Sequence, residues 1–365
     1  MKIICISAAQ IPSDTANSIQ VMKVCQAFAQ LGHAVTLLVP GNQPSGISQQ
    51  QLQNHYGLQV PFPIEWLAVR NRRLFPWKAA WRARHLSADL LYAWPLQSAT
   101  LGLLFGTPSM LELHDLPGGS FGPLWLRLFL IFPGRKRLLP ITDALRGALH
   151  LPKELTVIAP DGVDIERYRN LPEADSARRQ LNLPAAPTVL CTGHLYTGRG
   201  ADLFLKLAEK FPQASFVWVG GRPADVEAWK ERASHLTNVT FTGFASNDHI
   251  PLYQSAADVL LMPYGRAISG SSGGNIAEIF SPMKMFEYMA AGRAILTSDL
   301  PVLREVLDET RAVFSPLEQA DAWESALGGL LADPQWRETL GLHARSAVEQ
   351  YSWVKRAQRA LEGFL

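Results

Sequence analysis

One stretch of the sequence joins a helix with marked ends to a buried strand: Ser281-Pro-Met-Lys-Met-Phe-Glu-Tyr-Met-Ala-Ala-Gly292. Ser281 is a good N-cap residue, and Pro282 suits the first helical position because proline has no N–H group to leave unpaired. Gly292 favours the left-handed conformation that ends a helix. The apolar run 294–297 follows at once and predicts a buried strand, so this stretch indicates an α/β fold.

Two charged side chains, Lys284 and Glu287, interrupt this apolar helix three residues apart, so they share one face. Such pairs are often surface ion pairs that contribute little to stability. The start of the helix, however, offers N–H donors and a partial positive charge, which suit an anion. The small-residue segment 270–274 precedes it, and such loops often close over a ligand. An ion pair and a ligand site both remain open here.

The same alternation of helices and short apolar strands runs along the whole chain. In the first half the expected strands are 3–7, 35–39, 64–69, 90–94, 109–113, 138–142 and 157–159. In the second half they are 188–192, 215–219, 239–242, 259–262, 294–297 and 312–314. Strands buried on both faces and separated by helices predict parallel sheets. Because the polar segment 167–187 separates the two series, we expect two doubly wound domains, 1–168 and 169–350.

The composition is that of a folded protein, with 365 residues, 47% apolar and 18% charged, and a net charge of +2. Residues 1–165 carry 14 Lys and Arg against 9 Asp and Glu, which suggests an anionic partner. The cysteines, Cys5, Cys25 and Cys191, show no metal or disulfide spacing, so we expect a reduced, cytoplasmic chain. The most apolar later segment, 124–132, is too short to span a membrane.

A glycine-rich turn follows the first strand of the second domain: Gly193-His-Leu-Tyr-Thr-Gly-Arg-Gly200. Glycines let the backbone approach a ligand closely, and an anion can lie at the helix start after Gly200 with Arg199 binding it. An ordinary turn would use the same residues. Arg199 and Lys284 both follow strands of one sheet, so we expect both to reach one phosphate group.

Polar residues also follow strands of the first domain. His114 and Asp115 follow the strand 109–113, where a histidine can position hydroxyls, although a lone histidine is more often structural. The loop 8–18 is polar and can hold an acceptor, but it has no G-x-G-x-x-G pattern. The sequence shows no metal-ligand spacing and no G-x-S-x-G elbow, so neither a metal site nor a serine hydrolase is expected.

A basic and aromatic segment spans residues 70–85 and contains no acid. Its charged and aromatic members are Arg70, Arg72, Arg73, Phe75, Trp77, Lys78, Trp81, Arg82 and Arg84. This combination suits an anionic membrane surface, a solvated face or single-stranded nucleic acid. We expect the membrane surface and no nucleic acid, with 124–139 extending it.

Several motifs in order give the chain a resemblance to the retaining, metal-independent family 4 glycosyltransferases, also called group 1, of GT-B fold. The motifs are Leu31-Gly-His-Ala-Val35, Val157-Ile-Ala-Pro-Asp-Gly-Val-Asp164, Phe216–Gly221, Val239–Phe244, Ala256–Pro263, Ser281–Gly292 and Tyr351-Ser-Trp353. The resemblance implies two Rossmann-like domains facing a cleft and a last helix, 351–365, that returns to the first domain.

The resemblance also implies roles for single residues. Glu287 matches the second Glu of the family's Glu-x7-Glu motif, which holds the nucleotide ribose. Arg199 stands where the family has Lys for the donor diphosphate, and His194 stands where it has Arg. Lys284 and the helix start at Ser281 add to this site.

Three further positions complete the comparison with the family motifs. His114 matches the histidine near the transferred sugar, and the backbone at Phe244 meets the base. The first Glu of the Glu-x7-Glu motif falls on Ile279, so the contact with the donor sugar differs from the family pattern.

The implied function is transfer of a hexose from a nucleoside diphosphate sugar to an acceptor hydroxyl with retention, in cell envelope glycan biosynthesis. His114, Arg199 and Lys284 would be catalytic, and Gly193, Gly200, Phe244 and Glu287 would help bind the donor; no cofactor is expected. The acceptor would be a glycan, a lipid-linked molecule or a small molecule. Competing interpretations are a sugar-nucleotide epimerase and a non-catalytic sugar-nucleotide-binding relative.

Overall fold

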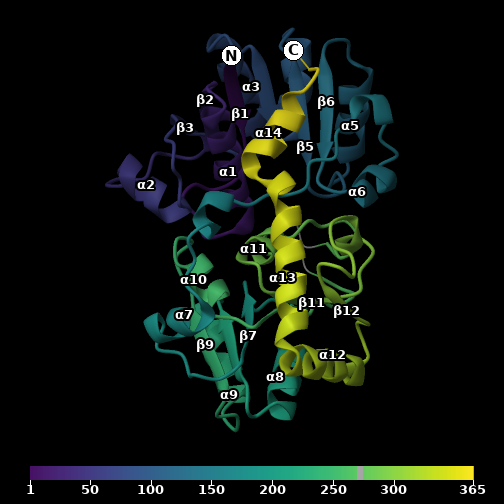
Figure 1. Cartoon of the computed structure of the whole chain (residues 1–365). Coiled ribbons are helices and arrows are strands. Elements are labelled where there is room, and N and C mark those ends of the chain that lie inside the picture. The colour runs from purple at the N-terminus through teal and green to yellow at the C-terminus, as the bar shows by residue number, and fades with distance from the viewer. Residues whose placement is uncertain (269–273, 365) are drawn as a thin grey trace. The chain divides into compact units, whose positions relative to one another are not determined.

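The computed structural model describes residues 1–268 and 274–364 (Figure 1). The chain divides into two compact units, of which the first contains Met1–Asp161 and Trp353–Leu365 and the second contains Gly162–Ser352. Each unit has its own parallel six-stranded sheet. The expected GT-B fold, with two Rossmann-like α/β domains, is confirmed.

The sheet of the first unit has the order β3-β2-β1-β4-β5-β6. Its strands are β1 (Lys2–Ile6), β2 (Ala34–Pro40), β3 (Ile64–Leu67), β4 (Leu90–Ala93), β5 (Ser109–Leu113) and β6 (Lys136–Pro140). Its helices are α1 (Ala16–Gln30), α2 (Gln49–Tyr56), α3 (Phe75–His85), α4 (Leu96–Leu104), α5 (Gly122–Ile131), α6 (Asp143–Ala148) and α14 (Trp353–Leu361). The strand order reverses between β1 and β4, and the carboxyl ends of strands at such a point are the usual ligand site of doubly wound folds.

Helix α14 belongs to the first unit although it is the last helix of the chain (Figure 1). Its buried residues are Trp353, Arg356, Ala357 and Ala360, which lie on one face at helical spacing. It packs against α1. At its other end Arg137 of β6 donates to the carbonyl oxygens of Ala360 and Glu362 at 2.6 and 2.7 Å, which satisfies carbonyl groups at the helix terminus.

The sheet of the second unit has the order β12-β11-β10-β7-β8-β9 and reverses between β7 and β10. Its strands are β7 (Thr188–Thr192), β8 (Ser215–Val219), β9 (Val239–Gly243), β10 (Val259–Met262), β11 (Ala294–Ser298) and β12 (Val313–Ser315). Its helices are α7 (Ala174–Gln180), α8 (Ala201–Lys210), α9 (Pro223–Arg232), α10 (Ile250–Ser255), α11 (Met283–Ala291), α12 (Ala320–Ala332) and α13 (Pro334–Val348). Both units therefore repeat one winding pattern.

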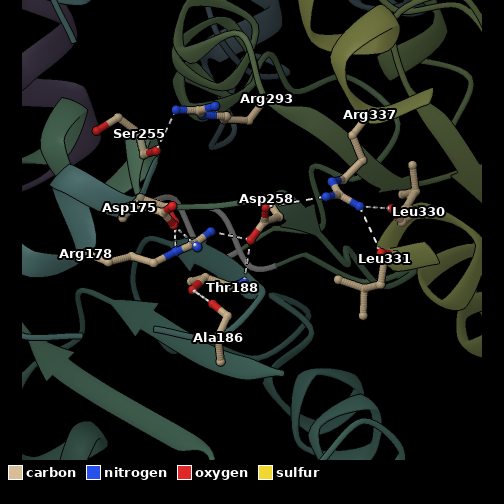
Figure 2. A network of polar contacts seen from close by, with 11 residues as sticks. Asp175, Arg178, Ala186, Thr188, Ser255, Asp258, Arg293, Leu330, Leu331 and Arg337 are labelled. Atoms are coloured by element: carbon tan, nitrogen blue, oxygen red, sulfur yellow. Dashed lines mark hydrogen bonds and ion pairs between the residues drawn. The ribbon is translucent and has the colours of Figure 1, made fainter. Parts of the chain in front are cut away.

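A polar network around Asp258 ties several of these elements together (Figure 2). Arg178 of α7 forms an ion pair with Asp258 and donates to the carbonyl oxygen of Ala256 at 2.9 Å. The backbone N–H of Thr188, at the start of β7, donates to the same carboxylate at 2.7 Å. Arg337 of α13 lies 3.7 Å from its other oxygen. Asp258 thus fixes α7 and α13 against the two central strands of the sheet.

The structure corrects two sequence predictions. Residues 157–159 are not a strand. They run alongside the edge strand β6 and are joined to it by two backbone hydrogen bonds, with a single β-bridge at Thr156. The N-cap of α11 is Pro282 and not Ser281, and it forms no side-chain capping bond. The predicted end is confirmed, because Gly292 is left-handed with φ of 65°. Of the loop 270–274, residues 270–273 lie outside the described residues.

Candidate functional site

The glycine-rich turn after β7 lies at the reversal of strand order in the second unit. Gly198 and Gly200 have φ of +81° and +83°, and a Cβ atom on them would come within 1.8 Å of the Ala267 carbonyl oxygen and 1.9 Å of the Pro263 carbonyl oxygen. The loops after β7 and β10 therefore cross at a distance that only glycine permits. Gly200 is also the N-cap of α8.

Two cations lie against one buried ring between these loops. The guanidinium carbon of Arg199 is 5.5 Å from the ring centroid of Tyr264, and Nζ of Lys284 is 5.2 Å from it. Nζ of Lys284 is also 3.9 Å from Sγ of Cys191, and an added Cβ on Gly193 would lie 3.4 Å from it. The structure thus brings Arg199, Lys284 and Gly193 together.

Arg199 and Lys284 both act electrostatically on Cys191, the second-last residue of β7. Burial raises the pKa of the Cys191 thiol, while both cations act to lower it. Two like charges in one small region repel each other, and a bound anion would remove that repulsion. The start of α11 lies beside them and favours the same anion.

Helix α11 is held to the end of β7 by hydrogen bonds of the Tyr288 hydroxyl to Thr192, which the sequence did not reveal. The backbone N–H of Thr192 donates to the hydroxyl of Tyr288 at 2.7 Å, and both residues are buried. Since Lys284 lies one turn earlier on the same helix, this bond fixes the lysine beside the glycine-rich turn.

Glu287 is oriented by a chain of buried polar side chains. Nε2 of Gln254 donates to Oε2 of Glu287 at 3.2 Å, and the Tyr168 hydroxyl donates to Oε1 of Gln254 at 2.8 Å. Gln254, Tyr168 and Tyr264 were not among the residues predicted from the sequence. A polar residue in an apolar helix, such as Gln254 in α10, is the one signal that points to such a role.

The remaining predicted donor residues also belong to the second unit. The ring of His194 stacks on Tyr196 at 4.9 Å, whereas Phe244 follows β9 and is 58% exposed. Ser281 is buried just before α11. Ile279 is also buried, whereas its neighbour Glu278 is exposed, so Ile279 and not Glu278 turns inward.

In the first unit, His114 follows β5 and contacts a buried carboxylate. Its Nε2 is 2.6 Å from Oε1 of Glu112. Burial alone would lower the pKa of His114, but the hydrogen bond and charge of Glu112 outweigh it and raise the pKa. The polar loop 8–18 follows β1, at the reversal of strand order in this unit. Its Ser13 N–H donates to the hydroxyl of Tyr56 at 2.8 Å, so the loop is held from α2.

Comparison with known proteins decides the family. The model of the family "Glycosyl transferases group 1" matches residues 186–333, which include Arg199, Lys284 and Glu287. A phosphatidyl-myo-inositol mannosyltransferase of Mycolicibacterium smegmatis is 30% identical over 357 residues, which are 91% of this chain and 85% of that protein. The chain belongs to the group 1 glycosyl transferases.

Another relative of this glycosyltransferase matches over a shorter length. A GDP-mannose-dependent alpha-(1-6)-phosphatidylinositol monomannoside mannosyltransferase of the same organism is 27% identical over 213 residues, which are 56% of this chain and 54% of that protein. The match therefore spans about half the length of that relative.

Solved structures agree on the fold. Anabaena HepE in complex with UDP-glucose has a TM-score of 0.75 at 18% identity, covering 99% of this chain and 98% of that one. A glycosyltransferase from Rickettsia africae has a TM-score of 0.78 at 11% identity and covers 100% and 97%. At these identities the likeness concerns the fold alone.

Proposed function

We propose that this glycosyltransferase moves a hexose from a nucleoside diphosphate sugar to an acceptor hydroxyl, with retained anomeric configuration and without a metal ion. The observation that carries the proposal is the pair of cations, Arg199 and Lys284, against Tyr264 at the start of α11. Two fixed positive charges and a helix start match a diphosphate, which is a multiply charged anion.

In the proposed mechanism the protein offsets charge that develops on the leaving diphosphate. Arg199, Lys284 and the N–H groups of α11 supply fixed positive potential there, which stabilises the transition state more than the ground state. Gly193 and Gly200 let the backbone approach the phosphates, with Ser281 near the helix start. These groups would do the work that a divalent cation does in metal-dependent transferases.

The rest of the donor is bound by residues around this centre. Glu287, oriented by Gln254, accepts hydrogen bonds from the ribose hydroxyls, and the backbone at Phe244 meets the base. His194 flanks the phosphates. His114 lies near the transferred sugar in this proposal.

A panel of nucleoside diphosphate sugars in a thermal-shift assay tests the donor. We expect one nucleotide series to raise the melting temperature, with the effect lost in the Lys284→Met variant and kept in Lys230→Met, which removes an exposed lysine of α9. Stabilisation by no donor would contradict the proposal and favour a non-catalytic relative. Conversion of the donor without any acceptor would favour an epimerase.

Two further measurements test the finer statements. The anomeric configuration of the product, read by proton NMR, must equal that of the donor if the reaction is retaining. Transfer must continue after dialysis against EDTA if no metal ion is needed. Within residues 1–268 and 274–364 no group of three His, Cys, Asp or Glu side chains could hold a metal ion.

We further propose that the acceptor is carried by a lipid and that the first unit docks on an anionic membrane. Helix α3 buries Phe75 and exposes Trp77 and Trp81, which lie one turn apart and are 48% and 56% exposed. Trp77 packs edge-on against Trp125 of α5 at 5.6 Å, so the two helices present one surface. Exposed aromatic rings beside basic residues suit the interface of an anionic bilayer.

The charges around these rings are those of residues 70–85, although not all of them are available. Arg82 forms a two-pronged ion pair with Glu65 at 2.7 and 3.0 Å, and Arg72 and Lys78 donate to carbonyl oxygens. Exposed apolar side chains around the helices extend the surface: Leu74, Phe121, Leu124 and Ile131. No described helix is long and apolar enough to cross a membrane.

Vesicle flotation tests this surface. We expect the full chain to float with vesicles containing phosphatidylglycerol at low salt and much less at high salt, because exposed charges are screened. The double variant Trp77→Ser, Trp81→Ser should lose most of the binding. Leu342→Ser, which removes an equally exposed apolar side chain from α13, should keep it. Equal loss in both variants, or binding that salt does not change, would contradict the proposal.

A further inference from the structure

An ion pair is buried inside the first unit. Nη2 of Arg356, on α14, lies 2.7 Å from Oε1 of Glu112, on β5, and both side chains are almost fully buried. Arg356 also donates to the carbonyl oxygens of Pro160 at 2.8 Å and Ala159 at 3.1 Å. Burying an ion pair costs desolvation energy that can exceed the attraction between the two charges. Its contribution to stability therefore does not by itself explain this pair, which indicates a functional role.

The carboxylate of Glu112 accepts hydrogen bonds from three other elements and contacts the end of its own strand. Besides Arg356, Gln20 of α1 and Tyr92 of β4 donate to it, and His114 approaches it from the end of its own strand. Of these partners His114 is the one with an exposed side, about one third of its side chain. The buried network therefore opens toward solvent at the histidine.

The charge of Glu112 determines which nitrogen of His114 carries a proton. Burial would raise the pKa of the Glu112 carboxyl, but Arg356, His114 and Tyr92 lower it to about 2. Glu112 is therefore ionised at working pH and can only accept, so Nε2 of His114 must donate to it. The other ring nitrogen, Nδ1, is then the one left to meet a substrate, as an acceptor in neutral His114 and as a donor in protonated His114.

We propose that Arg356 and Glu112 are positioning residues that fix the ring and the protonation of His114 for the transferred sugar or the acceptor. The role of His114 rests on the function proposed above, whereas the coupling of the three side chains does not. Ionised Glu112 accepts the Nε2–H of His114 and holds the ring plane, and Arg356 pairs with Glu112 and holds its carboxylate in place. The last helix of the chain would thus reach the reaction through a buried carboxylate on β5.

A third charged group, Asp161, acts on His114 besides Glu112 and Arg356. Glu112 and Asp161 favour its protonated form, and Arg356 opposes it. Asp161, which follows the segment 157–159 and is buried, has a pKa raised to about 6 by burial. Tyr92 of β4 has a raised pKa and stays neutral. The proposal therefore predicts that Glu112 and Arg356 have opposite effects on His114. The pKa of His114 should fall when Glu112 is removed and rise when Arg356 is removed.

A titration of His114 by NMR of ¹³C-histidine-labelled full chain tests this without any substrate. The signal is assigned by its loss in His114→Gln. Glu112→Gln should lower the pKa of His114, and Arg356→Met should raise it. Because either change leaves one buried charge alone and risks unfolding, the double variant Glu112→Gln, Arg356→Met removes both charges and should also lower the pKa. Leu91→Ala creates a cavity beside the buried strand β4 and serves as the control for destabilisation. It should leave the pKa of His114 unchanged.

Kinetics form the second arm. Glu112→Gln should lower kcat about 100-fold, at the low end of what a positioned acid or base contributes, with KM for the donor within about threefold. The pH at which kcat changes should move with the pKa of His114. If the pKa of His114 is unchanged in Glu112→Gln and in the double variant, or if it shifts equally in Leu91→Ala, the proposed coupling is wrong. If the NMR shifts occur while no donor is turned over, the proposed function fails and the coupling stands.

Discussion

Replacing Arg199 with methionine removes one of the two cations against Tyr264 and keeps the length of the side chain. When the bond to the sugar breaks, the leaving diphosphate gains about one unit of negative charge. A unit charge about 4 Å from a cation interacts by about 4 kcal/mol at an effective dielectric constant of about 20. Arg199 is partly exposed and Lys284 remains, so a smaller loss is expected. We expect about 2.7 kcal/mol, or about 100-fold in kcat, as for other donors to a developing oxyanion.

The assay is initial-rate kinetics with the donor identified by thermal shift. KM for the donor should rise much less than kcat falls, because the ground-state diphosphate carries less charge than the leaving group. Arg232→Met is the matched control, since Arg232 also lies over an aromatic ring, Trp229, but pairs with Asp202 on the surface. A kcat for Arg199→Met within threefold of the unmodified protein would refute the assignment. An equal fall in Arg232→Met would show that the effect is not local.

Three further predictions concern other parts of the molecule. Glu287→Gln should raise KM for the donor by about tenfold, the loss of about 1.4 kcal/mol expected for one hydrogen bond to a charged acceptor, with kcat within threefold. Asp258→Asn should lower the free energy of unfolding by about 3 kcal/mol in urea denaturation, because it leaves the buried guanidinium of Arg178 with only the exposed carboxylate of Asp175 as an ion-pair partner (Figure 2). Asp161→Asn should stabilise the protein at pH 7 by up to about 3 kcal/mol, because burial raises the pKa of Asp161 to about 6 and its ionisation opposes folding. That gain should shrink as pH falls from 6 and vanish below about pH 4, where the carboxyl is protonated in both states; a gain independent of pH would contradict this reasoning.

The sequence predicted most strands because their apolar runs are buried on both faces, and such runs are hard to mistake for anything else. It failed at residues 157–159, which are apolar but lie beyond the edge strand β6 and form only scattered backbone bonds to it. It also misplaced the start of α11 by one residue. Ser281 has the chemistry of a cap, but the backbone turns into the helix at Pro282. Local propensity does not determine which of two neighbouring residues makes that turn.

For the candidate site, the sequence predicted residues whose charge is unusual for their surroundings. Lys284 in an apolar helix and Arg199 in a glycine-rich turn both stood out. Tyr264, which lies against both, did not, because a tyrosine after a strand is an ordinary core residue. Gln254 was likewise hidden, since its partner Glu287 is 33 residues away along the chain. Pairings over such distances depend on the fold and not on local sequence.

The pairing of Arg356 with Glu112 is the extreme case, because 244 residues separate the two. In the sequence Arg356 is one of several basic residues in a C-terminal helix, and Glu112 is an acid in an apolar strand, which on its own argues against burial. The burial of each side chain is explained by the other, because a buried carboxylate needs a cation and a buried guanidinium needs acceptors. Without Arg356, ionised Glu112 would depend on protonated His114 for its counter-charge, so the pKa of His114 is expected to rise. The last helix is therefore expected to matter for chemistry as well as for packing, and Arg356→Met separates the two, because it keeps the helix and removes the charge.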